Sequence, residues 1–319
     1  MVMLKVRPVV SRLGQLFRSR RLQAPPLLMK RRPSPARARW HQAARKFATA
    51  TALSGGSAFA AALIRFGEVE PLTGRAHLAV LSHGEARERE EAEFAGFKEA
   101  NAHRTLRHDH GDVVRVRRIA LEMVRAAHHG LAIKQHYAAR GWIPRLLRDR
   151  SLQWMDGLHW EVLVLRCESA NACVFPGAGK ILVYSGLLCK SDVEMADELA
   201  HEVGHVVARH SSGVVNLIYP LAEKFRFLMP LAMALRRSNE LEAGEIGMLL
   251  LAAAGVDPVV AVLVENNSAK KTPEDTGMRK RLMASHPSRN RRCKFLSQPR
   301  VMGRALQLYS LVQSNAIGQ

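Results

Sequence analysis

The chain has 319 residues, 47% of them apolar, which is enough to bury one large core or two small ones and excludes an intrinsically disordered protein. Its formal net charge of +20 would suit a nucleic-acid-binding protein. However, fourteen Lys and Arg residues precede Glu68, the first acidic residue. Removing these from the 48 basic residues leaves 34 against 28 acidic ones, so residues 68–319 carry a net charge of only +6.

The first 46 residues are rich in Arg and free of acid, with Ser and apolar residues at nearly helical spacing, as in "MLKVRPVVSRLGQLFRSRRL". This composition is typical of a mitochondrial presequence, which is removed after import. The alternative is a basic tail that binds nucleic acid. The absence of acid over 67 residues favours targeting, so we expect a disordered presequence at 1–46 and no nucleic-acid partner.

An uncharged segment of eighteen residues, Phe47 to Ile64, comes next. Its length is at the lower limit for a membrane span, but its Ala, Thr, Ser and Gly residues are only weakly apolar. Composition alone therefore leaves both a membrane anchor and a flexible linker open for residues 47–66. We expect a single folded domain over residues 67–319.

The first half of this domain predicts helices and then strands. Residues 82–110 are strongly charged and predict a solvated helix followed by a loop, and the stretch from Asp112 has one apolar helical face. "HWEVLVLRCES" predicts a strand, and "NACVFPGAGKILVYSGLL" predicts a hairpin because two apolar runs flank Pro and Gly. "PGAGK" fails as a phosphate-binding loop, since Ile181 replaces the Ser or Thr that binds magnesium. The four cysteines form no Cys-x-x-Cys pair, so neither a zinc ribbon nor a thioredoxin-like site is indicated.

The second half is predicted to be helical. A helix begins at a capping box formed by Ser191 and Glu194. Residues 214–235 are rich in large apolar residues, interrupted by charges and two prolines; they could lie at a membrane surface, but packing on the domain is the preferred interpretation. Another helix is expected from Asn239, followed by a loop and a basic helix. The expected fold class is α+β, mainly helical, with a small β-sheet or hairpin beside the helix that begins at Ser191.

That helix contains the motif His-Glu-x-x-His at His201, Glu202 and His205. Residues four apart lie above one another on a helix, so the two imidazoles can aim at one metal ion. Glu202 points about 100° away, where it can accept a proton from water near the metal. The competing interpretation is chance, since fourteen His residues make such a match a matter of a few sequences per hundred, roughly.

A catalytic zinc site needs a third protein ligand. The metzincin pattern would require Gly and His where the chain has Ala208 and Ser211, and His210 is one position away, so that class is excluded. Gluzincins instead take a Glu from a later helix. The segment "NELEAGEIG" offers Glu240 and Glu242, of which helical geometry lets only one face the site.

Several blocks resemble the HtpX-like and CaaX-protease clan of membrane-associated zinc peptidases: "NACVFPGAGKILVYSGLL", "LAHEVGHVVARH", "NELEAGEIGMLLLAAAGVDP" and "ASHPS", in this order. "EPLTGRAHLAVLS" and "MDGLHWEVLVL" narrow the resemblance to the Oma-type peptidases of the mitochondrial inner membrane, in their plant form. The resemblance covers about residues 68 to 315. It is more specific than the metal motif alone because the blocks occur in the family's order.

The resemblance implies a role for each matching residue. His201 and His205 match the zinc-binding histidines, and Glu202 matches the general base. Glu240 matches the third zinc ligand. His286 of "SHP" falls where it would stabilise the oxyanion formed during peptide hydrolysis. The strand around Asn171 and Ala172 would pair with an extended substrate backbone.

The function implied is that of a zinc metalloendopeptidase with one Zn²⁺ per chain, anchored in the mitochondrial inner membrane, with its catalytic domain facing the intermembrane space. Its substrates would be inner-membrane proteins, including the dynamin-like fusion GTPase, cleaved in protein quality control. A homo-oligomer is left open. Because no nucleotide-binding signature is present, we expect hydrolysis to be independent of ATP.

One position departs from the family pattern. The family has an Asp four residues after the ligand Glu, and this chain has Gly244. That Asp would hold a ligand in place, and loss of such a residue typically lowers metal affinity or activity by about 10–100-fold. The chain between His210 and Glu240 is also shorter than is usual in the family. The alternative function is therefore a catalytically impaired homologue that acts as a membrane scaffold or binding partner.

Overall fold

The computed structural model describes residues 65–137, 148–149, 152–271 and 289–317. The predicted presequence and the uncharged segment at 47–64 lie outside the described residues, and so does His286. The described residues all belong to one compact unit, Ala58–Gln319.

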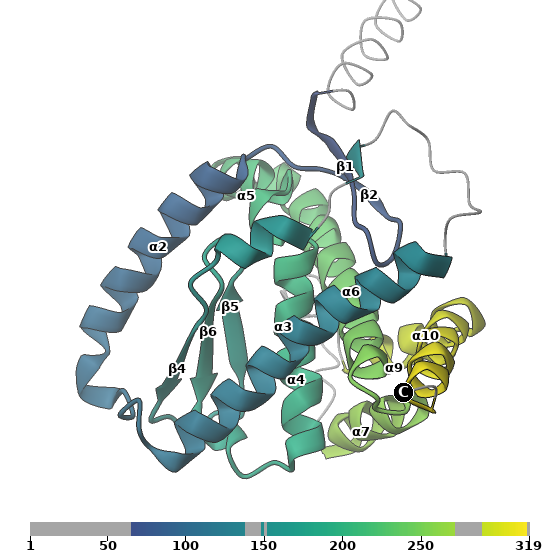
Figure 1. The fold of residues 1–319 in the computed structure, drawn as a ribbon. Helices are drawn as coiled ribbons and strands as arrows, with labels where there is room; N and C mark the ends of the chain where they lie inside the picture. Colours follow the sequence, from purple (N-terminus) through teal and green to yellow (C-terminus); the bar gives the residue numbers. More distant parts are fainter. Residues whose placement is uncertain (1–64, 138–147, 150–151, 272–288, 318–319) are drawn as a thin grey trace, which may run out of the picture. The chain divides into compact units, whose positions relative to one another are not determined.

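Long helices make up most of this unit, with two small sheets (Figure 1). The prediction of a mainly helical α+β domain is therefore confirmed. The α-helices are α2 (His83–Ala100), α3 (Gly111–Tyr137), α4 (Asp192–Val207), α5 (Val215–Lys224), α6 (Met229–Ala253), α7 (Pro258–Lys271), α9 (Arg289–Leu296) and α10 (Pro299–Ile317). The strands are β1 (Gly67–Val69), β2 (Ala76–Leu78), β3 (Arg148–Asp149), β4 (Glu161–Leu165), β5 (Ala172–Phe175) and β6 (Lys180–Tyr184).

The larger sheet has the strand order β4-β6-β5 and lies beside α4 (Figure 1). β5 and β6 form the predicted antiparallel hairpin, in which Cys173 pairs with Leu182. β6 also pairs with β4 in parallel, so β6 is central and β5 is an edge strand. β5 therefore has one edge that pairs with no strand of the described chain.

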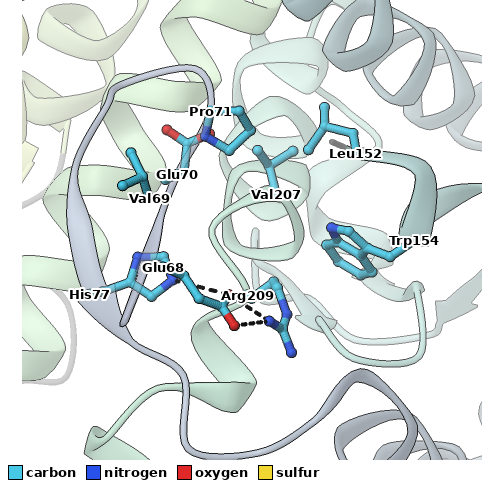
Figure 2. Close-up of a pocket in the computed structure, with 9 residues that line it drawn as sticks. All are labelled: Glu68, Val69, Glu70, Pro71, His77, Leu152, Trp154, Val207 and Arg209. Carbon is cyan, nitrogen blue, oxygen red and sulfur yellow. Dashed lines mark hydrogen bonds and ion pairs between the residues drawn. The ribbon is translucent and has the colours of Figure 1, made fainter. Parts of the chain in front are cut away.

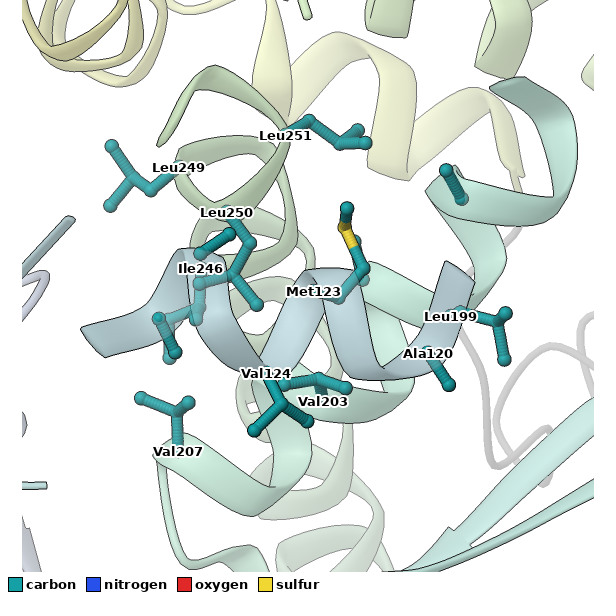
Figure 3. Close-up of a cluster of buried hydrophobic side chains, with 14 of the residues drawn as sticks. Ala120, Met123, Val124, Leu199, Val203, Val207, Ile246, Leu249, Leu250 and Leu251 are labelled. Atoms are coloured by element: carbon teal, nitrogen blue, oxygen red, sulfur yellow. The ribbon is translucent and has the colours of Figure 1, made fainter. Parts of the chain in front are cut away.

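The core lies where α3, α4 and α6 pack together (Figure 3). The capping box predicted at Ser191 is present: its side chain accepts from the Glu194 backbone N–H, and the Glu194 side chain accepts from the Ser191 backbone N–H. One face of α4 then buries apolar residues every three or four positions, as a helix packed on a core requires. Those of the core shown in Figure 3 include Met123, Leu199, Val203, Ile246 and Leu250.

Two predictions about residues 214–253 are wrong. The helix expected from Asn239 begins ten residues earlier, at Met229, because Pro230 occupies the first turn, where its missing N–H has no helical partner to lose. Pro220, expected to interrupt the segment, does not end a helix but lies inside α5.

The preferred interpretation of residues 214–235, packing on the domain, is also wrong for five of their large apolar side chains. These side chains are exposed to solvent: Leu217, Leu221, Phe225, Phe227 and Leu231. They lie on α5, on the start of α6 and on the turn that joins these two helices into a helical hairpin, and we call these five residues the apolar hairpin surface. Among the described residues, no helix combines the length and the apolar character needed to cross a bilayer.

Candidate metal centre

The site depends on an unusually close approach of α4 and α6, which two glycines permit. A Cβ atom on Gly204 of α4 would lie 2.5 Å from the backbone oxygen of Ala243 on α6. A Cβ atom on Gly247 of α6 would lie 3.0 Å from the backbone nitrogen of His201. Because neither side can carry a side chain here, the helices touch backbone to backbone, and a side chain on α6 can reach the His-Glu-x-x-His face of α4.

His201, His205 and Glu240 meet at this contact. The two Nε2 atoms of the histidines lie 3.3 Å apart. One carboxylate oxygen of Glu240 is 3.2 Å from Nε2 of His201, and the other is 3.6 Å from Nε2 of His205. His201 and Glu240 are only 4% and 8% exposed. The structure therefore brings together the three residues that the sequence predicted as metal ligands.

The spacing of these atoms fits a small divalent cation. Four donors placed tetrahedrally about 2.0–2.1 Å from a zinc ion lie about 3.4 Å from one another. The 3.3 Å between the two imidazole nitrogens is close to this value, and one atom from each of His201, His205 and Glu240 can be chosen so that all three lie within 4.8 Å of one another. Two imidazole nitrogens and one carboxylate also form the donor set of a known class of catalytic zinc sites. The residues present thus fit the metal that the motif implies.

Burial controls the protonation of the residues at the site. Burial, together with the nearby Arg292 charge, lowers the pKa of His201 to about 3, so its imidazole is neutral and can offer a lone pair to a metal. Burial also raises the pKa of Glu202 well above its usual range, and the Glu240 and Glu198 carboxylates add to this effect. Glu202 does not belong to the group of three donors, which leaves its carboxylate available for proton transfer.

Two further residues stand behind His205. Its Nδ1 atom lies 2.8 Å from Nδ1 of His210, and Nε2 of His210 lies 3.4 Å from an oxygen of Glu242. The prediction that only one of Glu240 and Glu242 can face the metal site agrees with this arrangement, because Glu242 contacts His210 and not the donors. The sequence did not predict the contact of His210 with His205 or that of Glu242 with His210.

An unusual backbone turn places His210. Arg209 follows the last turn of α4 with φ at 54°, a left-handed conformation that is uncommon for residues other than glycine. Its guanidinium is buried and donates to both carboxylate oxygens of Glu68, at 2.6 Å each (Figure 2). It also donates to the Leu81 carbonyl and to the Ser212 hydroxyl. These bonds hold the turn that folds His210 back toward His205.

A cleft of about 400 Å³ opens on the donor cluster. His205 and Glu240 line it, together with side chains from α2, the end of β5 and the start of α5. Ala172 lies in the edge strand β5 and is buried, while Asn171 is exposed just before it and its carbonyl accepts from the Tyr184 N–H. The cleft is lined by Val174 and Phe175 at the other end of β5, and neither Asn171 nor Ala172 lines it.

Gly244, where the family has Asp, lies four residues after Glu240 on α6 and therefore on the same helical face. A Cβ atom there would lie 3.7 Å from the side chain of Arg292 on α9, in ordinary contact. Arg292 lies 3.4 Å from the Asp197 carboxylate of α4. The missing Asp would therefore neighbour Arg292, and its absence removes no atom from the cluster of His201, His205 and Glu240.

Known metallopeptidases are similar to this chain in sequence. The model of "Peptidase family M48" matches residues 145–227 and 217–300. The mitochondrial metalloendopeptidase OMA1 of Arabidopsis thaliana is 30% identical, over 88% of this chain and 70% of its own length. The OMA1 proteins of Schizosaccharomyces pombe and Saccharomyces cerevisiae are 33% and 28% identical, and the chain spans about half of each, 52% and 54%. The chain belongs to peptidase family M48 and, within it, to the OMA1-type mitochondrial metalloendopeptidases.

Proposed function

We propose that this metalloendopeptidase uses one Zn²⁺, held by His201, His205 and Glu240, to hydrolyse peptide bonds of inner-membrane proteins without ATP. The single observation that carries the proposal is the convergence of two imidazole nitrogens and a carboxylate at 3.2–3.6 Å, with Glu202 on the same helix. The inner membrane as location, an orientation toward the intermembrane space and a role in quality control complete the proposal. They rest on the resemblance to the Oma-type peptidases.

The chemistry follows from the positions of the residues. Zinc, when bound, supplies a Lewis acid that polarises a carbonyl and makes water more acidic. Glu202 takes up the proton that water loses on attacking the peptide carbon and gives it to the leaving amine. Burial raises the pKa of this carboxylate well above its usual range, which suits a group that takes up a proton and then releases it. The role of His286 as an oxyanion partner stays a prediction.

The cleft defines how a substrate would bind. β5 offers an extended backbone the edge that pairs with no described strand, with Asn171 and Ala172 at its start. Phe175 and Val215 give the cleft apolar walls, and Arg236 adds a positive charge. These features favour an unfolded or extended protein segment over a folded protein as the substrate.

A measurement of metal content and peptide hydrolysis tests the proposal. We expect the purified full chain to contain about one zinc per molecule and to cleave an extended reporter peptide in the absence of any nucleotide. A chelator should abolish cleavage and added zinc should restore it, because the donors hold the metal reversibly. Zinc well below one per chain, or cleavage that needs ATP, would contradict the proposal.

The impaired-homologue alternative is motivated by Gly244. In its favour, the family Asp is absent and a residue that supports a metal ligand typically contributes about 10–100-fold to affinity or activity. Against it, the position neighbours Arg292, which still has Asp197 as a partner. Normal folding combined with zinc far below one per chain would favour the scaffold function.

Membrane association draws support from the apolar hairpin surface. Its five side chains come from α5, the start of α6 and the turn between them, and Phe227 is 78% exposed. Lys224 and Arg236 lie over the aromatic rings of Phe225 and Tyr219, at 5.6 and 4.8 Å. Exposed aromatic and aliphatic side chains flanked by cations are typical of surfaces that enter the interface of an anionic bilayer. Because α5 and α6 also line the cleft, this surface would hold the cleft near the membrane.

Site-specific fluorescence tests this surface in the full chain. In Phe227→Trp, we expect additional tryptophan emission that vesicles of phosphatidylcholine and phosphatidylglycerol shift to the blue and that brominated lipid quenches. The matched control is Leu263→Trp on α7, a position 53% exposed whose emission should respond to neither. If the indole introduced by Phe227→Trp remains open to aqueous iodide with vesicles present, the surface does not meet lipid.

A further inference from the structure

The contact between His205 and His210 determines where the protons of both rings must lie. A neutral imidazole has one N–H and one lone pair. If Nε2 of His205 offers its lone pair to a metal, as the proposed zinc site requires, the proton of His205 is on Nδ1. That atom lies 2.8 Å from Nδ1 of His210, so it donates to the lone pair there.

The contact with His205 also determines the position of the His210 proton. With its Nδ1 accepting, His210 carries its own proton on Nε2, which lies 3.4 Å from the Glu242 carboxylate. Glu242 is buried, so water does not screen its interaction with His210. The series Glu242–His210–His205 therefore has one consistent set of protons, and it ends with a lone pair aimed at His201 and Glu240.

We propose that His210 and Glu242 are positioning residues that hold His205 in its Nδ1-protonated form and in the orientation that binds the metal. This proposal rests on the proposed zinc site. His210 is not itself a ligand, because its Nε2 atom faces Glu242 and the group of atoms able to share a cation consists of His201, His205 and Glu240. A ligand histidine commonly donates its second N–H to a carboxylate or a carbonyl; here a second imidazole relays that contact.

The left-handed turn at Arg209 explains how the support is built. A non-glycine residue held in this conformation is destabilising and persists only where its surroundings fix it. The paired bonds from Arg209 to Glu68 do so. The turn brings the rings of His205 and His210 to 4.8 Å between centroids, crossed at 73°, which permits the edge-to-edge contact of their Nδ1 atoms.

Zinc affinity measured by competition with a chelator tests the proposal in the full chain. The Phe in His210→Phe fills the space of the imidazole but cannot accept the hydrogen bond from His205. We expect this variant to bind zinc about 10–100-fold more weakly. His210→Gln keeps a carbonyl acceptor, so its zinc Kd should lie closer to that of the unsubstituted chain. His129→Phe is the matched control, since His129 contacts the Ala253 carbonyl at the far end of α6 and should leave the Kd unchanged.

Each outcome has one meaning. An unchanged zinc Kd in His210→Phe would overturn the proposal. If His210→Gln loses as much zinc affinity as His210→Phe, the proposal also fails, because the changed shape of the side chain at residue 210 would then explain both losses. Should His210→Phe fail to fold, Glu242→Leu, which offers the His210 Nε2–H no acceptor, decides: we expect zinc to bind at least about threefold more weakly, and an unchanged Kd overturns the proposal. If the unsubstituted chain binds no zinc, the proposed function itself fails.

Discussion

Glu202→Gln is expected to lower the rate of peptide hydrolysis by about 10²–10⁴-fold, the range that a positioned general base contributes. The amide has nearly the shape of the carboxylate but cannot take up the proton that water loses. Because Glu202 stands outside the group of three donors, the variant should still bind one zinc per chain. Zinc content and kcat on a reporter peptide, measured together, separate loss of the base from loss of the metal.

Glu198→Gln provides the matched control for this substitution. Glu198 is also a buried carboxylate of α4, one turn before Glu202, and it pairs with Lys190 at 3.0 Å. We expect kcat to change by no more than about a few-fold, since this carboxylate pairs with Lys190 and acts on Glu202 only through its charge, which adds to the raised pKa of Glu202. Hydrolysis at the normal rate by Glu202→Gln would contradict the assigned role, and equal losses in both variants would indicate a general electrostatic effect.

Local patterns in the sequence were sufficient for much of the fold. The capping box at Ser191, the β5–β6 hairpin around "PGAG" and the strand "EVLVL" each depend on a few neighbouring residues, and all three are present. The start of α6 could not be found in this way. Pro230 reads as a break in a run of residues, whereas at the first turn of a helix it is favourable.

The burial of residues 214–235 could not be predicted for a different reason. The segment is apolar on nearly every side, so its pattern does not tell which face packs on the domain. The structure buries Val215, Ala222, Ala232 and Met233 and leaves the larger side chains of the apolar hairpin surface in solvent. Which face is buried depends on the packing of α5 on α6, which is a property of the fold and not of the segment.

The site shows the same division between local and long-range information. The spacing of His201 and His205 follows from one helix, and the choice of Glu240 follows from the family resemblance. His210 stands one position before the third histidine of the metzincin pattern, so that pattern assigns it no role. Its contact with His205 depends on a left-handed residue, Arg209, that is not glycine and gives no sequence signal.

Gly204→Ala is expected to damage the metal centre without touching a donor. The new Cβ atom would lie 2.5 Å from the Ala243 backbone oxygen, so α4 and α6 must move apart. Overpacking of this kind costs about 1–3 kcal/mol of folding free energy. Because Glu240 reaches the two histidines across this same contact, a shift of about 1 Å would also lower activity by about 100-fold. Urea unfolding of the metal-free chain measures the loss of stability, and kcat on the reporter peptide together with chelator competition measures the damage to the metal centre.

Gly244→Ala on α6 is the control, because it adds the same methyl group four positions after Glu240. Its Cβ atom would lie 3.7 Å from the Arg292 side chain, where nothing has to move. Replacing a helix-interior glycine by alanine stabilises by about 0.5–1 kcal/mol, so this variant should gain stability and keep its zinc affinity. If Gly244→Ala instead loses stability and zinc affinity while Gly204→Ala keeps both, the close approach of α4 and α6 is not what brings the Glu240 carboxylate to the imidazoles.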